Sequence, residues 1–221
     1  MKTDTIRALL AEFLGTALLL IGVVASGIMG DTLSNGNTAI ALLANAIATG
    51  CMLYVIITVL GPISGAHFNP MVTLAFWIRR DIALPRGGLF VLAQVSGGLV
   101  GVMASHAMFD MSLLQASTTS RTGIAQWISE AIASFGLLFV IFGGLKARPD
   151  QVPMLVGLYI TGAYWFTSST SFANPAVTIA RSFTDTFAGI APGDVAGFVS
   201  VQLLTALIVT LPLAWMFADR K

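Results

Sequence analysis

The chain carries six apolar stretches whose length fits a lipid bilayer. They run over residues 8–30, 38–60, 87–109, 124–145, 153–169 and 195–218. A helix needs about 20 predominantly apolar residues to cross the hydrocarbon core of a membrane. With 56% hydrophobic and only 10% charged residues, the chain also holds more apolar side chain than a soluble domain of its size can bury. We therefore expect an all-α membrane protein with six transmembrane helices.

Basic residues are sorted between the segments that connect these stretches. Nine of the eleven fall on one side of a six-span arrangement: Lys2, Arg7, Arg79, Arg80, Arg86, Lys146, Arg148, Arg220 and Lys221. Only Arg121 and Arg181 fall on the other side. The positive-inside rule then places both termini and the 79–86 and 146–152 loops in the cytoplasm, which requires an even number of spans. We expect a multi-pass protein of the cell (inner) membrane.

Several functional classes leave no trace in the sequence. The basic residues do not pool into a patch that would bind nucleic acid. A single cysteine, Cys51, cannot form an internal disulfide, and the two histidines do not give a metal-ligand spacing with it. A nucleophile with a matching base is also missing, so we expect neither an enzyme nor a cofactor or metal.

An internal repeat relates the two halves of the chain. Residues 67–75 (HFNPMVTLA) resemble residues 172–180 (FANPAVTIA). Two further pairs recur within the apolar stretches, and these are Glu12 with Glu130 and Gln94 with Gln202. Each half, about 6–109 and about 122–218, holds three spans, so the second half must insert upside down. We expect one domain over residues 1–221 with a functional site near the bilayer midplane, as in inverted repeats.

Each Asn-Pro pair of the repeat predicts the start of a short helix. Asparagine is a favoured cap, and proline fits the first turn of a helix. The segments from Pro70 to about Trp77 and from Pro175 to about Phe183 are too short to cross a bilayer. We interpret them as two half-helices, entered by re-entrant loops from opposite faces, that meet end to end.

Such a meeting predicts a constriction at the centre of the membrane. Helix N-termini carry partial positive charge, so the centre repels cations, while the asparagine amides offer donors to a neutral solute. The predicted constriction consists of Asn69, Pro70, Met71, Asn174, Pro175 and Ala176.

The buried carboxylates need partners at this depth. We expect Glu12 and Glu130 to accept hydrogen bonds from backbone N–H groups of the two loops, with Gln94 and Gln202 as further interior supports. A proton relay is the alternative role for an intramembrane carboxylate.

With these motifs the chain resembles the aquaporin, or major intrinsic protein, family over essentially its whole length. The resemblance rests on residues 64–70 (SGAHFNP), on residues 174–176 (NPA), and on the paired Glu and Gln residues. It implies an aquaporin-like fold and a homotetramer with one pore in each subunit. It also implies a narrow outer filter of four positions.

Carried over by spacing from the two motifs, the filter positions are Thr49, Gly162, Ser171 and Val177. The family usually has arginine where this chain has Val177. The resemblance therefore implies a wide, weakly charged filter, suited to glycerol, urea and neutral metalloid hydroxides such as arsenous acid. A shift of the loop by one residue would bring Phe172 in place of Ser171.

Two charged or ionisable residues have more than one interpretation. Arg181 either pairs with Asp185, four residues further on, or reaches back towards the mouth of the pore. His67 is either a packing residue or part of the cytoplasmic mouth.

Taken together, the sequence predicts a passive channel for small uncharged solutes and water in contact with membrane lipid. A mainly water-selective channel is the first alternative. A secondary transporter with inverted repeats is a more remote one, because apart from the two Glu residues the sequence offers no buried ion ligands.

Overall fold

The computed structural model describes residues 3–218, and every regular element in this range is helical. The elements are α1 (Thr3–Leu33), α2 (Thr38–Ser64), α3 (Pro70–Ile78), α4 (Leu84–Met108), α5 (Ile124–Ala147), the 3₁₀ helix η1 (Pro149–Gln151), α6 (Val152–Phe166), α7 (Pro175–Arg181) and α8 (Pro192–Met216).

Six of these helices correspond to the six apolar stretches. In the described part of the chain, five of them, α1, α2, α4, α5 and α8, are long and apolar enough to cross a membrane. The sixth, α6, has 15 residues, which is about 22 Å of helix. The sequence predicted that this span runs to residue 169. It ends at Phe166 instead, because Thr167 adopts an extended backbone with φ −111° and ψ 137°.

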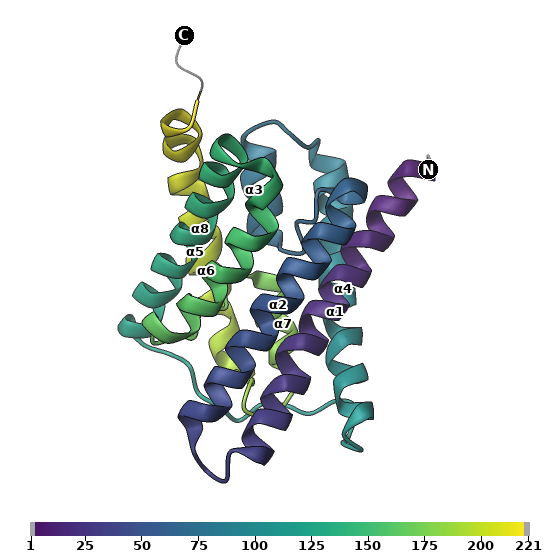
Figure 1. Cartoon of the computed structure of the whole chain (residues 1–221), viewed down its shortest axis with the longest axis vertical. Helices are drawn as coiled ribbons and strands as arrows, with labels where there is room; N and C mark the ends of the chain where they lie inside the picture. The colour runs from purple at the N-terminus through teal and green to yellow at the C-terminus, as the bar shows by residue number, and fades with distance from the viewer. Residues whose placement is uncertain (1–2, 219–221) are drawn as a thin grey trace.

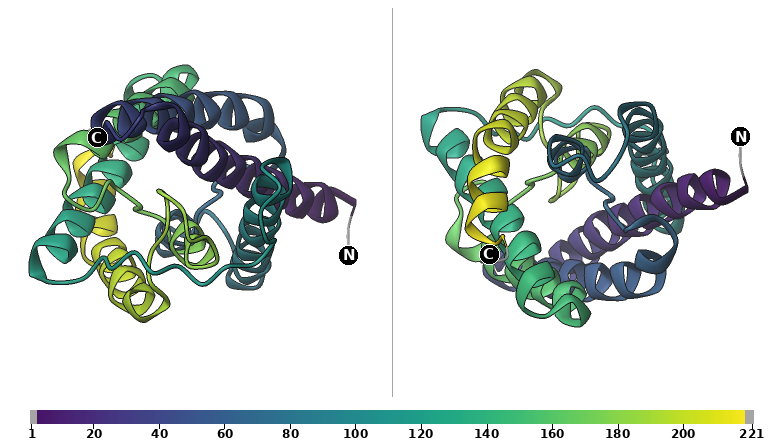
Figure 2. Two further views of the ribbon diagram at one scale, coloured as in Figure 1. Left: turned by 90° about the horizontal axis from the view of Figure 1, so that it is seen from below. Right: turned by 90° about the horizontal axis from the view of Figure 1, so that it is seen from above.

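Two short helices, α3 and α7, lie within the frame of long ones. α3 lies in the half of the molecule where α1 begins, and α7 lies in the other half (Figure 1). Each packs against both α4 and α8, and the end-on views show them filling the gap between these two helices (Figure 2). α1 begins and α8 ends at the same end of the molecule (Figure 1), which fits an even number of crossings.

The packing of the long helices follows the repeat. In the first half α1 packs against α2 and α4, and in the second half α5 packs against α6 and α8. α2 and α6 join the two halves. α1 thus corresponds to α5, α2 to α6, and α4 to α8, as two related halves require.

Glycine allows the closest of these contacts. A β-carbon at Gly97 of α4 would collide with the carbonyl oxygen of Phe13 on α1, and one at Gly101 would collide with that of Ala17. Small residues let helix backbones approach in this way inside a membrane, where lipid removes the usual hydrophobic drive for association. The outer faces of the long helices stay apolar, as at Leu92 and Ile208, which suits contact with lipid.

Candidate functional site: a cavity between facing half-helices

The two asparagines of the repeat lie at the centre of the molecule and cap the two short helices. Asn69 Oδ1 accepts a hydrogen bond from the Met71 N–H at 2.9 Å, and Asn174 Oδ1 accepts from the Ala176 and Val177 N–H groups at 3.0 and 3.3 Å. The Asn-Pro signal therefore places the helix starts at Pro70 and Pro175.

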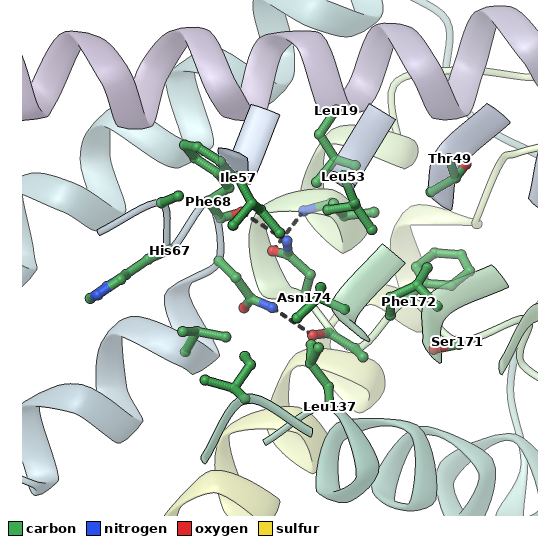
Figure 3. Close-up of a pocket in the computed structure, with 18 of the residues that line it drawn as sticks. Leu19, Thr49, Leu53, Ile57, His67, Phe68, Leu137, Ser171, Phe172 and Asn174 are labelled. Carbon is green, nitrogen blue, oxygen red and sulfur yellow. Dashed lines mark hydrogen bonds between the residues drawn. The ribbon is translucent and has the colours of Figure 1, made fainter. Parts of the chain in front are cut away.

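The same asparagines also connect the two halves of the chain. Asn69 Nδ2 donates to the Ala173 carbonyl at 2.7 Å, and Asn174 Nδ2 donates to the Phe68 carbonyl at 2.9 Å. These two bonds, dashed in Figure 3, hold the loop tips against each other. Each amide nitrogen carries two hydrogens, so each asparagine keeps one N–H beyond this bond.

The loops that lead into α3 and α7 share an unusual backbone. Left-handed φ values occur at matching positions: Gly65 (93°) with Thr170 (59°), Ala66 (51°) with Ser171 (51°), and Phe68 (47°) with Ala173 (44°). Residues other than glycine rarely adopt this conformation, which costs about 1–3 kcal/mol each and persists only where the surroundings hold it in place. The loops therefore depend on external support.

Glu12 supplies this support to the first loop. Its Oε1 accepts from the Ser64 hydroxyl at 2.6 Å and the His67 N–H at 3.0 Å. Its Oε2 accepts from the Phe68 N–H and from Gln94 Nε2, both at 2.7 Å. A fully buried carboxylate thereby satisfies two loop N–H groups that have no helix or sheet partner.

Glu130 makes the matching set of bonds with the second loop. Its Oε1 accepts from the Ser169 hydroxyl at 2.6 Å and the Phe172 N–H at 2.9 Å. Its Oε2 accepts from the Ala173 N–H at 2.8 Å and from Gln202 Nε2 at 2.7 Å. All four donors occupy the repeat-related positions of those around Glu12, so the structure places both carboxylates where the sequence expected them.

A cavity of about 120 Å³ runs past both asparagines. Residues 65–69 and 171–174 of the two loops form one wall, and apolar side chains of α1, α2, α5 and α6, such as Leu53 and Val156, form the other. Figure 3 shows His67 at one end of the cavity, Thr49, Ser171 and Phe172 at the other, and Asn174 between them. We call these the His67 end and the Thr49 end.

At the Thr49 end the structure gathers three of the four predicted filter residues. Thr49, Ser171 and Val177 line the cavity, and each is at most 5% exposed. Phe172 lines it as well, so the two loop residues that the sequence offered as alternatives are both present.

The fourth predicted filter residue, Gly162, is a correction. It is exposed on the outside of α6 and does not line the cavity. The face of α6 that lines it carries Val152, Val156, Ile160 and Tyr164, at helical spacing. Counting back from the second motif failed because residues 167–174 are not helical, so the phase of α6 cannot be carried across them.

Tyr164 is the residue that this reasoning missed. It is 3% exposed, and its hydroxyl lies 3.2 Å from Thr49 Oγ1. The apolar spacing of four residues along 152–164 is a sequence signal that could have found it. Tyr164 thus adds an aromatic ring that the sequence did not predict to that of Phe172, which the sequence offered as an alternative to Ser171.

The remaining members of the predicted constriction lie behind it. Met71 and Ala176 are fully buried and are absent from the cavity lining. Pro70 and Pro175 face a separate apolar pocket between α3, α4, α7 and α8. The structure thus brings only the two asparagines of this set to the cavity, and Met71 fills interior space.

Arg181 lines the cavity and does not pair with Asp185. Its side chain is 2% exposed, its Nε donates to the Ala188 carbonyl, and its guanidinium carbon lies 3.5 Å from the centroid of the Phe172 ring. The Asp185 carboxylate instead accepts from the backbone and hydroxyl of Thr118 at 2.8 and 2.9 Å. The ion pair that the four-residue spacing favoured is therefore corrected.

His67 lies at the opposite end of the cavity (Figure 3). Its Nδ1 lies 3.1 Å from Thr73 Oγ1, and its ring centroid lies 4.7 Å from that of Phe76. A group of three or more His, Cys, Asp or Glu side chains that could hold a metal is not found within residues 3–218.

Comparisons with known proteins agree on one family. A family model described as "Major intrinsic protein" matches residues 1–169. Aquaglyceroporin AqpS of Rhizobium meliloti (strain 1021) is 52% identical over 218 residues, which cover 99% of this chain and 93% of that protein. Aquaporin PIP2-1 of Arabidopsis thaliana is 30% identical over 204 residues, covering 82% and 70% of the two chains.

A solved structure supports the same fold. The X-ray structure of the aquaglyceroporin from Plasmodium falciparum superposes with a TM-score of 0.71 at 20% identity, covering 96% of this chain and 95% of that one. Together with the facing asparagine caps and the paired carboxylates, these matches show that the chain belongs to the major intrinsic protein family.

Proposed function

We propose that this protein is a passive transmembrane channel for water and small uncharged solutes, with glycerol, urea and neutral metalloid hydroxides as the solute class. The observation that carries the proposal is the cavity itself, which reaches from His67 past Asn69 and Asn174 to Thr49. A water molecule needs about 10–15 Å³ of such space, so a cavity of about 120 Å³ holds a short file of waters or one small polyol.

The lining explains why a neutral, hydrogen-bonding solute suits this path. One wall carries asparagine amides and loop backbone, and the opposite wall is apolar, as at Leu53 and Leu137. A glycerol-like solute has a polar and an apolar side that fit these two walls. The N-termini of α3 and α7 meet at the asparagines and disfavour cations there.

Size selection belongs to the Thr49 end in this proposal. Val177 is compact and uncharged, and Thr49 and Tyr164 offer hydroxyl groups 3.2 Å apart. Arg181 supplies a cation one helical turn beyond Val177 and lines the same cavity. In this proposal the positive charge of Arg181 lies one turn away from the filter position of Val177. The uncharged filter position favours solutes larger than water.

The assembly and its membrane are part of the same proposal. We place one pore in each subunit of a homotetramer in the cell (inner) membrane, with both termini in the cytoplasm. The sorted basic residues support this orientation. The protein performs no chemistry and needs no cofactor in this account.

The test compares the passage of several solutes into proteoliposomes that contain the purified protein. Stopped-flow light scattering should show faster passage of water, glycerol, urea and arsenous acid than in empty liposomes. The relative named for glycerol transport, aquaglyceroporin AqpS, supports including the larger solutes. Passage of water alone would replace the proposal by the water-selective alternative.

A further inference from the structure

The two ends of the cavity are built on ring stacks that occupy repeat-related positions. At the His67 end the imidazole lies 4.7 Å from the Phe76 ring centroid and 5.5 Å from that of Phe90. At the Thr49 end, Phe172 takes the place of the imidazole and lies 5.1 Å from the ring of Phe198. The other neighbour differs between the two ends: His67 lies beside the phenyl ring of Phe76, whereas Phe172 lies beside a guanidinium group.

Arg181 is that guanidinium, and the repeat relates its position to that of Phe76. It lies over the Phe172 ring at 3.5 Å, and the ring holds it in place through a cation–π contact. Among residues 3–218, the cavity wall therefore carries a fixed positive charge at the Thr49 end and none at the His67 end.

This charge has no carboxylate within ion-pair distance in the described part of the chain, and Glu130 attracts it only from further away. The ion pairs found within residues 3–218 do not include Arg181 or Arg121. Arg121, whose guanidinium carbon lies 5.2 Å from the Phe172 centroid, directs its Nε to the Gly189 carbonyl. The carboxylate of Glu130, which supports the same loop, already accepts four hydrogen bonds. Burying a cation without a partner is costly, so this end favours an anion.

A second, independent feature adjoins the same space. Ser171 is 3% exposed and lines the cavity, while its hydroxyl oxygen is buried behind that lining and has no hydrogen-bond partner among residues 3–218. Buried hydroxyls are almost always paired. The repeat-related position holds Ala66, so the loop conformation does not require a hydroxyl here.

We infer that Arg181 and Ser171 form a binding site for a small planar oxyanion at the Thr49 end. The Nε of Arg181 is engaged with Ala188, which leaves the two terminal nitrogens as a fork that matches two oxygens of a carboxylate, nitrate or bicarbonate group. When its side chain rotates about Cα–Cβ, the unpaired Ser171 hydroxyl turns to the cavity and donates to such an oxygen. Since Ser171 belongs to the proposed filter, an anion bound beside it slows the neutral solute, and this consequence rests on the proposed function.

Calorimetric titration of the purified protein with nitrate tests the site without relying on conduction. Nitrate stays charged at working pH, and chloride, which is not a planar oxyanion, controls for ionic strength. We expect one nitrate per chain. Ser171→Ala should weaken binding about tenfold, since one hydrogen bond to a charged group is lost, and Arg181→Gln should abolish it. Ser134→Ala is the matched control, because that hydroxyl is also unpaired but lies outside the cavity lining and its loss should leave nitrate binding unchanged.

Flux measurements complete the test. Nitrate should slow glycerol passage at the concentrations at which it binds, and Ser171→Ala should shift that dependence by the same factor. Absence of nitrate binding to the unmodified protein, or equal affinity in Ser171→Ala, would overturn the site. Glycerol passage without nitrate reports on the proposed function separately, so failure of one is not mistaken for failure of the other.

Discussion

At the scale of single residues, the Thr49 end is defined by what stands at Val177. The side chain is 5% exposed and lines the cavity one turn before Arg181 on α7. Its compact apolar surface leaves room that a long cationic side chain would fill. Thr49, Ser171 and Tyr164 then provide hydroxyls around it. The proposed function thus assigns charge and size selection to different residues.

Val177→Arg should reduce glycerol passage at least about tenfold, because it adds bulk and charge to the filter. A rise of only about 1.4 kcal/mol in the barrier to glycerol is enough for a tenfold change. Water, being smaller, should lose much less. Stopped-flow light scattering of proteoliposomes measures both rates. Val177→Leu, which adds bulk without charge, is the control. Equal loss of water and glycerol passage in Val177→Arg, or no loss, would remove Val177 from the filter.

The carboxylates are the second residue-scale determinant. Glu130→Gln keeps the shape of the side chain but turns one acceptor oxygen into a donor that faces the Ala173 N–H and the Gln202 amide. We expect the protein to lose about 3 kcal/mol of stability, since two hydrogen bonds to a charged group are removed. Thermal unfolding in detergent measures the loss. Asp31→Asn, at an exposed carboxylate, should change little, and a Glu130→Gln protein as stable as the original would contradict the role in loop support.

At the scale of helices, the account depends on how closely α1 and α4 approach. Gly97 sits where the two backbones meet, whereas a β-carbon added to Gly88, on the same helix, would meet no atom within 4 Å. The two glycines therefore separate the effect of close packing from that of helix propensity.

Gly97→Ala should destabilise the protein by about 1–3 kcal/mol, as overpacking does, while Gly88→Ala should be neutral or stabilising by up to about 1 kcal/mol. Thermal unfolding of the two variants side by side measures the difference. Comparable stability of both would mean that α1 and α4 are not in close contact in the membrane protein.

The loops between the helices add a pH-dependent contact. Hydrogen bonds from the backbone and hydroxyl of Thr118 hold the pKa of the Asp185 carboxyl below its usual range. A lowered folded-state pKa gives stability that is present above the unfolded-state pKa and is lost as pH falls through the folded-state value. The thermal stability of Asp185→Asn should therefore decline less steeply in that acidic range than that of the unmodified protein. Identical pH profiles would show that this contact does not hold the two loops together.

Features that depend on local sequence signals were predictable. Features that depend on which face of a helix turns towards the cavity were not. The starts of α3 and α7 follow from Asn69-Pro70 and Asn174-Pro175, because capping is a local interaction. The lining role of Tyr164 did not follow from counting back from the second motif, because the non-helical stretch after Phe166 breaks the register of α6. Of the two interpretations of Arg181, the position at the cavity holds. The pairing with Asp185 does not, because the end of α7 at Arg181 frees the following loop to turn Asp185 towards Thr118.

At the scale of the whole molecule, two inverted halves make one path with unlike ends. The asparagines bond to the opposite loops at 2.7 and 2.9 Å and hold the halves together at the centre. Each carboxylate supports its own loop with the same four kinds of donor. The cavity lies between these fixed parts, and within residues 3–218 its wall carries fixed positive charge only at Arg181. Such a frame suits a passive path.

The most direct measurement of this account follows tracer glycerol into proteoliposomes with and without sodium or proton gradients. The account predicts that glycerol equilibrates to equal concentrations on both sides at one rate under all gradients, while the vesicles stay electrically tight. Accumulation above the outside concentration, or a rate that depends on either gradient, would contradict a passive channel.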